Sequence, residues 1–364
     1  MAENNEHFTY LLGAGASCNA LPLVSNMGEK LRFFIAWFKD LYAVQQPLSG
    51  KPGISRQLND IEKEFITSLK WLEKECGNNT SIDTYAKKLY HQGDFDRYNR
   101  LKATLSCYFM IEQARLRVDQ RYDNFFASIL ENESGSAKLP PDINIISWNY
   151  DSQLERSYSS FLKDAAENIL GEQISVSMQL IPRKDEKMEI DRDKFSIVKI
   201  NGSAEAHSIN NSDFHDYDKF PYFKEVNQEV IDKVMEWYNQ YINRKDKPIS
   251  TLIHFAWETD DPYPRKMKDQ LLKVTGKTTT LIVIGYSFPF FNRGIDKLYL
   301  ENMKNLRRVY IQVPEADGPA HRERFEALIS ERKTIITSGG FIANPPPEIY
   351  LKHDTDQFFL PYEF

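Results

Sequence analysis

The stretch FTYLLGAGAS, residues 8–17, decides how the rest of the chain is interpreted. A mostly apolar run over residues 8–12 leads into Gly13 and Gly15, and a helical pattern begins near Asn26. A strand, a glycine turn and a helix are typical of a phosphate-binding βα unit, where glycine lets the backbone approach a pyrophosphate. The third glycine of the dinucleotide fingerprint is Cys18 here. A tight turn between a strand and a helix therefore explains the two glycines equally well.

The composition is that of a globular protein with a mixed, solvated surface. The chain has 364 residues, of which 41% are hydrophobic and 27% charged, and its formal net charge is −6. This acidic balance indicates no overall basic surface for nucleic acid. Cys18, Cys76 and Cys107 are too few for a four-cysteine zinc site, and their wide spacing predicts a reducing, cytoplasmic location. The start of the chain has no secretory signal pattern, and no apolar run approaches the roughly 20 residues that span a bilayer.

Apolar runs alternate with helical patterns along most of the chain. Strands are predicted at residues 8–12, 143–148, 174–181, 195–200, 252–256, 281–286 and 309–313. Such alternation predicts an α/β fold with a doubly wound, mostly parallel sheet. The segment from residue 26 to 138 is instead almost all helical, including one long pattern over residues 96–130, which is too much for a single crossover.

We therefore expect a helical module that interrupts the sheet domain after its first strand. Residues 1–25 would hold the first strand and the glycine loop, and residues 26–138 the helical insertion. Residues 139–338 would complete the sheet domain, with a further helical pattern over residues 213–244. Residues 339–364 would form an extended tail that lies over the surface or a neighbour.

Polar residues and glycine follow the predicted strands. These strand ends are Gly13–Ser17, Trp148–Asp151, Asn201–Ser203, Gly285–Phe288 and Gln312. Ligands of open α/β sheets bind at the carboxyl ends of the strands. The five strand ends together are therefore harder to explain as turns than any one alone, and they predict a common site.

The ordered motifs GAGAS (13–17), WNYD (148–151), NGS (201–203) and GYSF (285–288) resemble the sirtuin-like NAD-hydrolysing domains of bacterial anti-phage systems. The segment SIDTYAKKL, residues 81–89, is similar to the helical insertion of that group. The resemblance covers most of residues 8–317 and implies a Rossmann-like NAD-binding domain. It implies three sets of binding residues: Gly13, Ala14, Gly15 and Ser17 at the pyrophosphate, Asn149 and Asp151 at the nicotinamide ribose, and Gly285, Ser287 and Gln312 at the adenosine.

The third motif departs from the family, whose catalytic histidine is replaced here by Asn201, followed by Gly202. His207, six residues later on a predicted loop, could take its place or be an ordinary solvated histidine. A histidine base contributes about 10²–10⁴-fold in rate, and nicotinamide leaves without a general acid because cleavage neutralises its pyridinium charge. We expect Asn149, Asp151 and His207 to be catalytic, and Asn201 and Gly202 to bind the substrate. Asn149 could instead cap the following helix.

The resemblance implies an NAD glycohydrolase that cleaves NAD to nicotinamide and ADP-ribose, depleting NAD in abortive defence. NAD would be the substrate, and no metal is expected. The alternative is a subunit that binds NAD or ADP-ribose with little turnover and serves the regulation or assembly of a defence complex. The sequence has no GxxxxGK[ST] loop, so the HerA-type ATPase that accompanies such domains would be a separate partner. An aromatic content of 13% is compatible with a homo-oligomer, and we expect no direct contact with nucleic acid or a membrane.

Overall fold

The computed structural model describes thirteen stretches of the chain. They are residues 6–42, 57–133, 136–162, 173–174, 176–181, 190–208, 226–243, 249–255, 257–258, 262–330, 335–336, 342–343 and 346–364.

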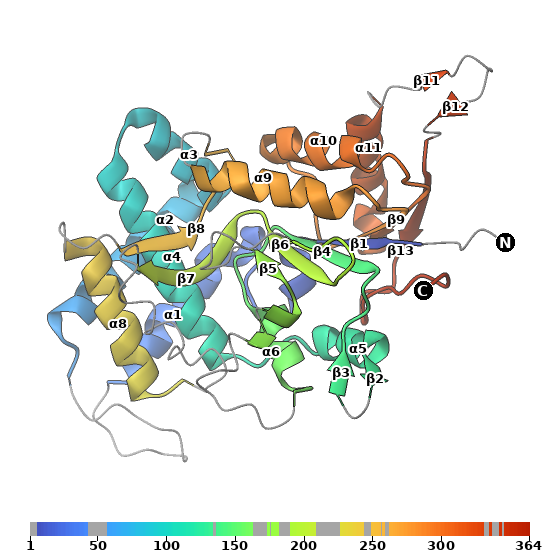
Figure 1. Ribbon diagram of the computed structural model, residues 1–364. Helices are drawn as coiled ribbons and strands as arrows, with labels where there is room; N and C mark the ends of the chain where they lie inside the picture. Colours follow the sequence, from blue (N-terminus) through green and yellow to red (C-terminus); the bar gives the residue numbers. More distant parts are fainter. Residues whose placement is uncertain are drawn as a thin grey trace.

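A seven-stranded parallel sheet forms the centre of the structure (Figure 1). Its strands, in the order in which they lie side by side, are β13 (Glu348–Lys352), β10 (Arg308–Gln312), β9 (Thr280–Ile284), β1 (Phe8–Leu12), β4 (Ile143–Ser147), β6 (Ser196–Lys199) and β5 (Leu180–Ile181). The first strand pairs with β4 on one side and with β9 on the other. The chain order therefore switches direction at β1, where the loops of a doubly wound sheet part and leave a crevice. The predicted α/β class is confirmed.

Helices cover both faces of this sheet, as the apolar composition of its strands requires. One face packs against α9 (Pro262–Thr275), α10 (Arg293–Asn302) and α11 (Gly318–Ile329), which lie together above the sheet in Figure 1. The other face packs against α5 (Gln120–Ile129) and α6 (Gln153–Ser159). Side chains alternate between the two faces along each strand. In β1, Leu11 belongs to the first core, and Tyr10 and Leu12 belong to the second.

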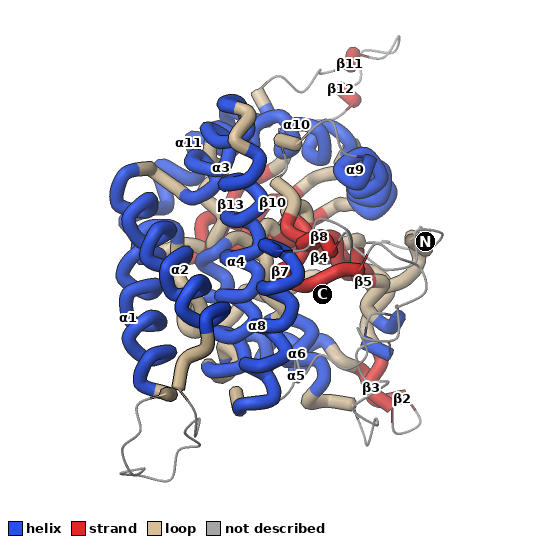
Figure 2. Tube along the Cα trace, turned by 90° about the vertical axis from the view of Figure 1, so that its left-hand side faces the viewer, coloured by secondary structure: helices blue, strands red, loops and turns tan. Residues whose placement is uncertain are grey.

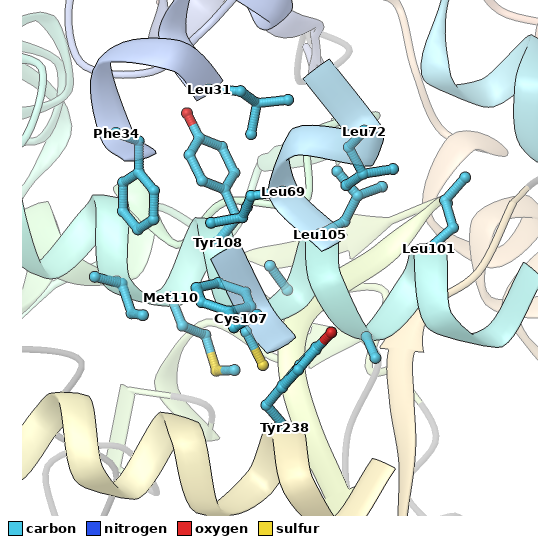
Figure 3. Close-up of a cluster of buried hydrophobic side chains, with 14 of the residues drawn as sticks. Leu31, Phe34, Leu69, Leu72, Leu101, Leu105, Cys107, Tyr108, Met110 and Tyr238 are labelled. Carbon is cyan, nitrogen blue, oxygen red and sulfur yellow. The ribbon is translucent and has the colours of Figure 1, made fainter. Parts of the chain in front are cut away.

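A separate helical core lies beside the sheet. It is built by α1 (Met27–Asp40), α2 (Asp60–Asn78), α3 (Ile82–Gln92), α4 (Phe95–Arg115) and α8 (Gln228–Asn243), which gather on one side of the molecule in Figure 2. Phe34, Leu69, Tyr108 and Tyr238 are buried at its centre (Figure 3). The ring of Phe34 meets the edge of Tyr108 at a centroid distance of 4.9 Å. Burying one such side chain contributes about 1.5–3 kcal/mol to stability. The many buried side chains of this cluster give the module a hydrophobic core of its own.

The limits of the helical module differ from the expected residues 26–138. The expected helix over residues 96–130 breaks after Arg115, because Asp119 caps a new helix by accepting a hydrogen bond from the backbone N–H of Arg121. That helix, α5, packs against the sheet and not against the helical core. The helical core instead receives side chains from α8 and from an antiparallel pair of strands. This pair is β7 (Gly202–Ser208) and β8 (Ile249–Ile253). The module is therefore assembled from two separate parts of the chain.

Two predicted strands differ from the structure, and one predicted helix is only partly described. The strand expected at residues 252–256 corresponds to β8, which pairs with β7 outside the main sheet. Of the strand expected at residues 174–181, only β5 is extended, and the described residues before it are mostly helical or in a turn. Part of the helix expected over residues 213–244 lies outside the described residues, and α8 is its described portion.

Part of the tail expected over residues 339–364 lies outside the described residues, and its described portion belongs to the sheet domain. Its strand β13 adds to the edge of the sheet in parallel with β10. Tyr350 lies opposite Tyr310 in this pairing, and their rings stack at a centroid distance of 5.2 Å. Two further short pairs lie at the periphery, β2 (Glu131–Glu133) with β3 (Ser136–Lys138), and β11 (Ile335–Ile336) with β12 (Ile342–Ala343) (Figure 1). None of the helices in the described part of the chain combines the length and the apolar character needed to cross a lipid bilayer.

Candidate functional site

A cavity of about 340 Å³ opens at the carboxyl ends of the central strands. It lies at the switch point next to β1, where an open α/β sheet binds its ligands. The sequence-predicted residues that line it are Gly13, Ala14, Ser17, Asn149, Asp151, Asn201, Gly285 and Ser287. The fold thus brings four segments that are distant in sequence around one space.

The two glycines after β1 pack against the loop that follows β9. The backbone N–H of Gly13 donates to the carbonyl of Ile284 at 3.0 Å, and that of Gly15 donates to the carbonyl of Gly285 at 3.0 Å. A Cβ atom on Gly13 would lie 2.5 Å from the Gly285 carbonyl oxygen, and one on Gly15 would lie 2.7 Å from the Gly285 Cα. Glycine is therefore required here by the contact between the two loops, whatever ligand binds. The turn continues into a short 3₁₀ helix, Ala14–Ser17.

The first turn of α5 anchors the same loop from the opposite side. Arg121 donates from Nη2 to the carbonyls of Gly15 and Ala16, at 3.1 and 3.0 Å. Its guanidinium also pairs with the carboxylate of Asp119 at 2.6 Å, and both side chains are buried. The loop is thus held by a charged group that the sequence motif does not contain. The resemblance pointed to no role for this part of the chain.

Asn149 and Asp151 are joined to the glycine loop by hydrogen bonds. The Asn149 Nδ2 atom donates to the carbonyl of Gly13 at 2.9 Å, and Ser17 Oγ donates to Asp151 Oδ2 at 2.8 Å. Ser17 Oγ also lies 2.9 Å from the hydroxyl of Tyr122. Asn149 does not cap the next helix; Asp151 Oδ1 accepts a hydrogen bond from the first N–H of that helix, at Gln153. The Asn149 amide therefore stands at the cavity wall next to the glycine loop.

A buried set of charges lies beneath the WNYD motif. Lys199, at the end of β6, donates to the Asp151 carbonyl at 2.6 Å and forms an ion pair with Glu155. Burial raises the pKa of the Asp151 carboxyl, and the nearby Lys199 opposes that rise. The Lys199 ammonium and the hydrogen bonds from Ser17 and from the start of α6 favour the charged form of Asp151, but they do not fully offset the effect of its burial.

Asn201, which stands where the resemblance would place a histidine, is hydrogen-bonded to the neighbouring strand end. Its Nδ2 atom donates to the Trp148 carbonyl at 3.2 Å, and its own carbonyl accepts the N–H of His254 at 2.9 Å. Gly202 follows with a φ of 74°, the left-handed conformation that glycine adopts without strain. Asn201 thus reaches the cavity, and Gly202 makes the turn into β7.

The sequence predicted that His207 lies on a loop, and the structure shows that it does not. Its backbone is part of β7, where it pairs with Ser250 of β8. A strand advances about 3.3 Å per residue, so five positions beyond Gly202 correspond to about 16 Å of chain. The backbone of His207 therefore runs away from the strand end, and its side chain lies outside the described residues.

Gln312 is the last residue of β10, and its side chain contacts the C-terminal tail. The amide nitrogen donates to the carbonyls of Asp354 and Gln357, at 2.5 and 2.6 Å, and the amide oxygen accepts the N–H of Phe359 at 3.0 Å. Gln312 is buried, with 4% of its surface exposed. Its amide is therefore engaged within the chain and not directed to an adenosine.

We expect Gln312→Ala to loosen the tail and to leave the cavity intact. The substitution leaves two carbonyls and one N–H of the tail without their partners, which costs about 1–3 kcal/mol for each group that stays away from water. Hydrogen exchange of residues 353–360 should accelerate, whereas that of residues 13–17 should stay unchanged. Unchanged exchange of residues 353–360 in the Gln312→Ala variant would contradict this assignment.

The walls of the cavity also contain residues that the motifs did not identify. Trp148 and Tyr286 stack face to face, with centroids 5.4 Å apart and planes inclined by 6°. The Tyr286 hydroxyl donates to the buried Asp296, and burial raises the pKa of Asp296 to about 7. The start of α3 supplies a further wall through Ser81, Ile82 and Asp83. Their segment was singled out by resemblance, but no residue in it carried a predicted role.

No protein-family model matches this sequence, and a comparison with curated proteins finds no match. The geometry of the cavity is therefore the guide to what this protein binds. Its lining combines the glycine backbone, hydroxyl, amide and carboxylate groups of the predicted residues with apolar side chains such as Leu21, Val24 and Phe109, which suits a ligand with both polar and apolar parts. Among the described residues, no group of three or more histidine, cysteine or acidic side chains could hold a metal ion.

Proposed function

We propose that this protein binds NAD in the cavity and hydrolyses it to nicotinamide and ADP-ribose. The observation that carries the proposal is the contact between the glycine loop and the WNYD motif at the switch point of the sheet. Asn149 reaches Gly13, and Asp151 reaches Ser17, so the groups expected at the pyrophosphate and at the ribose share one cavity. The order of the four motifs along the chain supports the same ligand.

The reaction needs few catalytic groups. The bond between the ribose C1′ and the nicotinamide nitrogen breaks, and its electron pair neutralises the pyridinium. Water adds to C1′ and loses a proton. The Asn149 amide would hold a ribose hydroxyl, and the hydrogen bond from Ser17 to the Asp151 carboxylate keeps that edge of the cavity ordered. Fixed polar groups of this kind stabilise charge that develops in the transition state.

The test is nicotinamide release from NAD, measured by chromatography with purified protein. Asn149→Ala is expected to lower the rate by about 10²–10³-fold, the usual cost of removing one preorganised amide. Asn99→Ala, an exposed asparagine of α4, is the matched control and should leave the rate unchanged. Failure of the wild-type protein to bind NAD in calorimetry would contradict the proposal.

One observation favours a second candidate, a subunit that binds NAD or ADP-ribose without turnover. The position of the family histidine holds Asn201, whose amide is bonded to the Trp148 carbonyl. An amide cannot act as a base, so binding would persist while cleavage stopped. Tight binding of ADP-ribose together with no nicotinamide release would select this candidate.

The biological role is part of the same proposal and is supported by the resemblance alone. NAD depletion would serve abortive anti-phage defence in the cytoplasm, with a separate HerA-type ATPase as partner and a homo-oligomer as the working form. Measuring the mass of the protein alone and with such an ATPase tests the assembly. A monomer that forms no complex would contradict that part.

A further inference from the structure

The proposed hydrolysis needs a group in the cavity that accepts the proton of the water that attacks C1′. Two carboxylates, Asp83 and Asp151, line the cavity. Both oxygens of Asp151 already accept hydrogen bonds, from Ser17 and from the N–H of Gln153. Asp151 is thus occupied in holding the loop and the start of α6, which leaves the second carboxylate to be examined.

Asp83 reaches the cavity from the helical module. It lies in the first turn of α3. Ser81 caps this helix, and its hydroxyl accepts the N–H of Thr84 at 3.1 Å. The Tyr150 hydroxyl donates to Asp83 Oδ1 at 2.8 Å. Tyr150 stands between Asn149 and Asp151 in the sequence, so this bond aligns the carboxylate with the strand-end motif. Within the described part of the chain, Asp83 Oδ2 accepts no hydrogen bond.

We propose that Asp83 is a catalytic residue of the NAD cleavage proposed above, and that it does the work of the absent motif histidine. Its carboxylate accepts the proton of the water that forms the new bond to C1′, while the C1′–nicotinamide bond breaks and its electron pair stays on nicotinamide. The proton then passes from Asp83 to solvent. The inference rests on the proposed function and adds the base that this function needs.

The electrostatics of the cavity suit this task. Burial raises the pKa of Asp83, and the hydrogen bond from Tyr150 opposes the rise. Burial also raises the pKa of Tyr286, and the charges of Asp296 and Asp83 add to that rise. A carboxylate with a raised pKa is a stronger base than an exposed one. The other titratable groups that line the cavity are Cys76, Tyr150 and Asp151, and Lys87 follows one turn later on α3.

The alternative is a purely structural role, in which Asp83 only stabilises α3. An acidic residue in the first turn of a helix interacts favourably with the helix dipole. The chain offers a matched control for this effect. Asp96 occupies the first turn of α4 in the same module and is exposed. Any effect of the helix dipole should therefore appear equally in Asp96→Ala.

Asp83→Ala should lower nicotinamide release by about 10²–10⁴-fold, the range of a lost general base. The KM for NAD should change by only a few-fold, and Asp96→Ala should behave as the wild type in both. Azide needs no base, so adding it to Asp83→Ala should restore nicotinamide release and yield an ADP-ribosyl azide that mass spectrometry detects. Asp83→Asn, which keeps the shape of the side chain, serves if the alanine variant does not fold.

Tyr150→Phe tests the role of Asp83 through the pH dependence of kcat. A purely structural role of Asp83 would leave this pH dependence unchanged. Because the Tyr150 hydrogen bond lowers the pKa of Asp83, its removal raises that pKa. Activity depends on ionised Asp83, so the acid limb of the kcat profile should shift to higher pH. Asp83→Asn should abolish this limb.

The outcomes separate the two proposals. If the wild type cleaves NAD and Asp83→Asn cleaves it at the same rate, Asp83 is not the base, whereas the proposed function stands. Azide that fails to restore a slow Asp83→Ala variant also overturns the assignment. A wild-type protein that binds saturating NAD and releases no nicotinamide overturns both.

Discussion

Gly285→Ala is expected to lower the free energy of unfolding by about 2–5 kcal/mol and to abolish the NAD binding proposed for the cavity. Two effects add. Gly285 has a φ of 62°, where a side chain costs about 1–2 kcal/mol. Its Cβ would also lie 2.4 Å from the carbonyl carbon and Cα of Gly15, which are backbone atoms that cannot rotate away. Relief requires the two loops to separate, and overpacking of this kind costs about 1–3 kcal/mol.

Denaturation in urea measures the loss of stability, and calorimetry with NAD measures the loss of binding. Gly294→Ala is the control, because a Cβ at that position in α10 has no neighbour within 4 Å. It should be neutral or stabilise the protein by up to about 1 kcal/mol, the helical preference of alanine over glycine. Equal stability of Gly285→Ala and the wild type would show that the loops after β1 and β9 do not pack as closely as described.

Among substitutions that remove one charged side chain, Lys199→Met should cause the largest loss of stability. Lys199 is 1% exposed, and its ammonium serves both the Glu155 carboxylate and the Asp151 carbonyl. Methionine preserves most of the volume but leaves Glu155 as a buried charge without its pairing cation. Breaking a buried pair in this way costs about 3–5 kcal/mol. The midpoint of urea unfolding should fall accordingly.

A double-mutant cycle tests the cause. Lys199→Met combined with Glu155→Leu should recover much of the lost stability, because a buried ion pair can be replaced by apolar residues at little cost. Arg322→Met is the surface comparison: its pair with Glu326 at 2.8 Å is about half exposed on both sides, so it should cost less than about 1 kcal/mol. Additive losses at Lys199 and Glu155 would contradict their coupling.

Several elements of the fold could be predicted because their pattern is local. The apolar run over residues 8–12 is the strand β1, and it lies at the centre of the sheet. Runs near residues 143, 281 and 309 likewise correspond to β4, β9 and β10. Strands buried on both faces must be apolar at successive positions, which a sequence shows directly. The fold class follows from the alternation of such runs with helices.

The membership of each core could not be predicted in the same way. A helical period shows that α5 and α8 each have an apolar face, but it does not show what that face contacts. In the structure, α5 covers the sheet, and α8 joins the helical module from more than 100 positions further along the chain. Residue spacing contains no information on such distant partners.

The residues at the strand ends likewise show which features depend on local sequence and which depend on long-range contacts. By itself, the sequence determined the apolar strands, the glycines and the polar groups that follow them, because these depend on local spacing and residue type. Only the tertiary structure decided that Asn149 meets Gly13, that Gln312 holds the tail, and that Asp83 enters the cavity from another core. Polar residues after a strand are alike in sequence. Their roles differ because long-range packing selects which backbone or side chain each one meets.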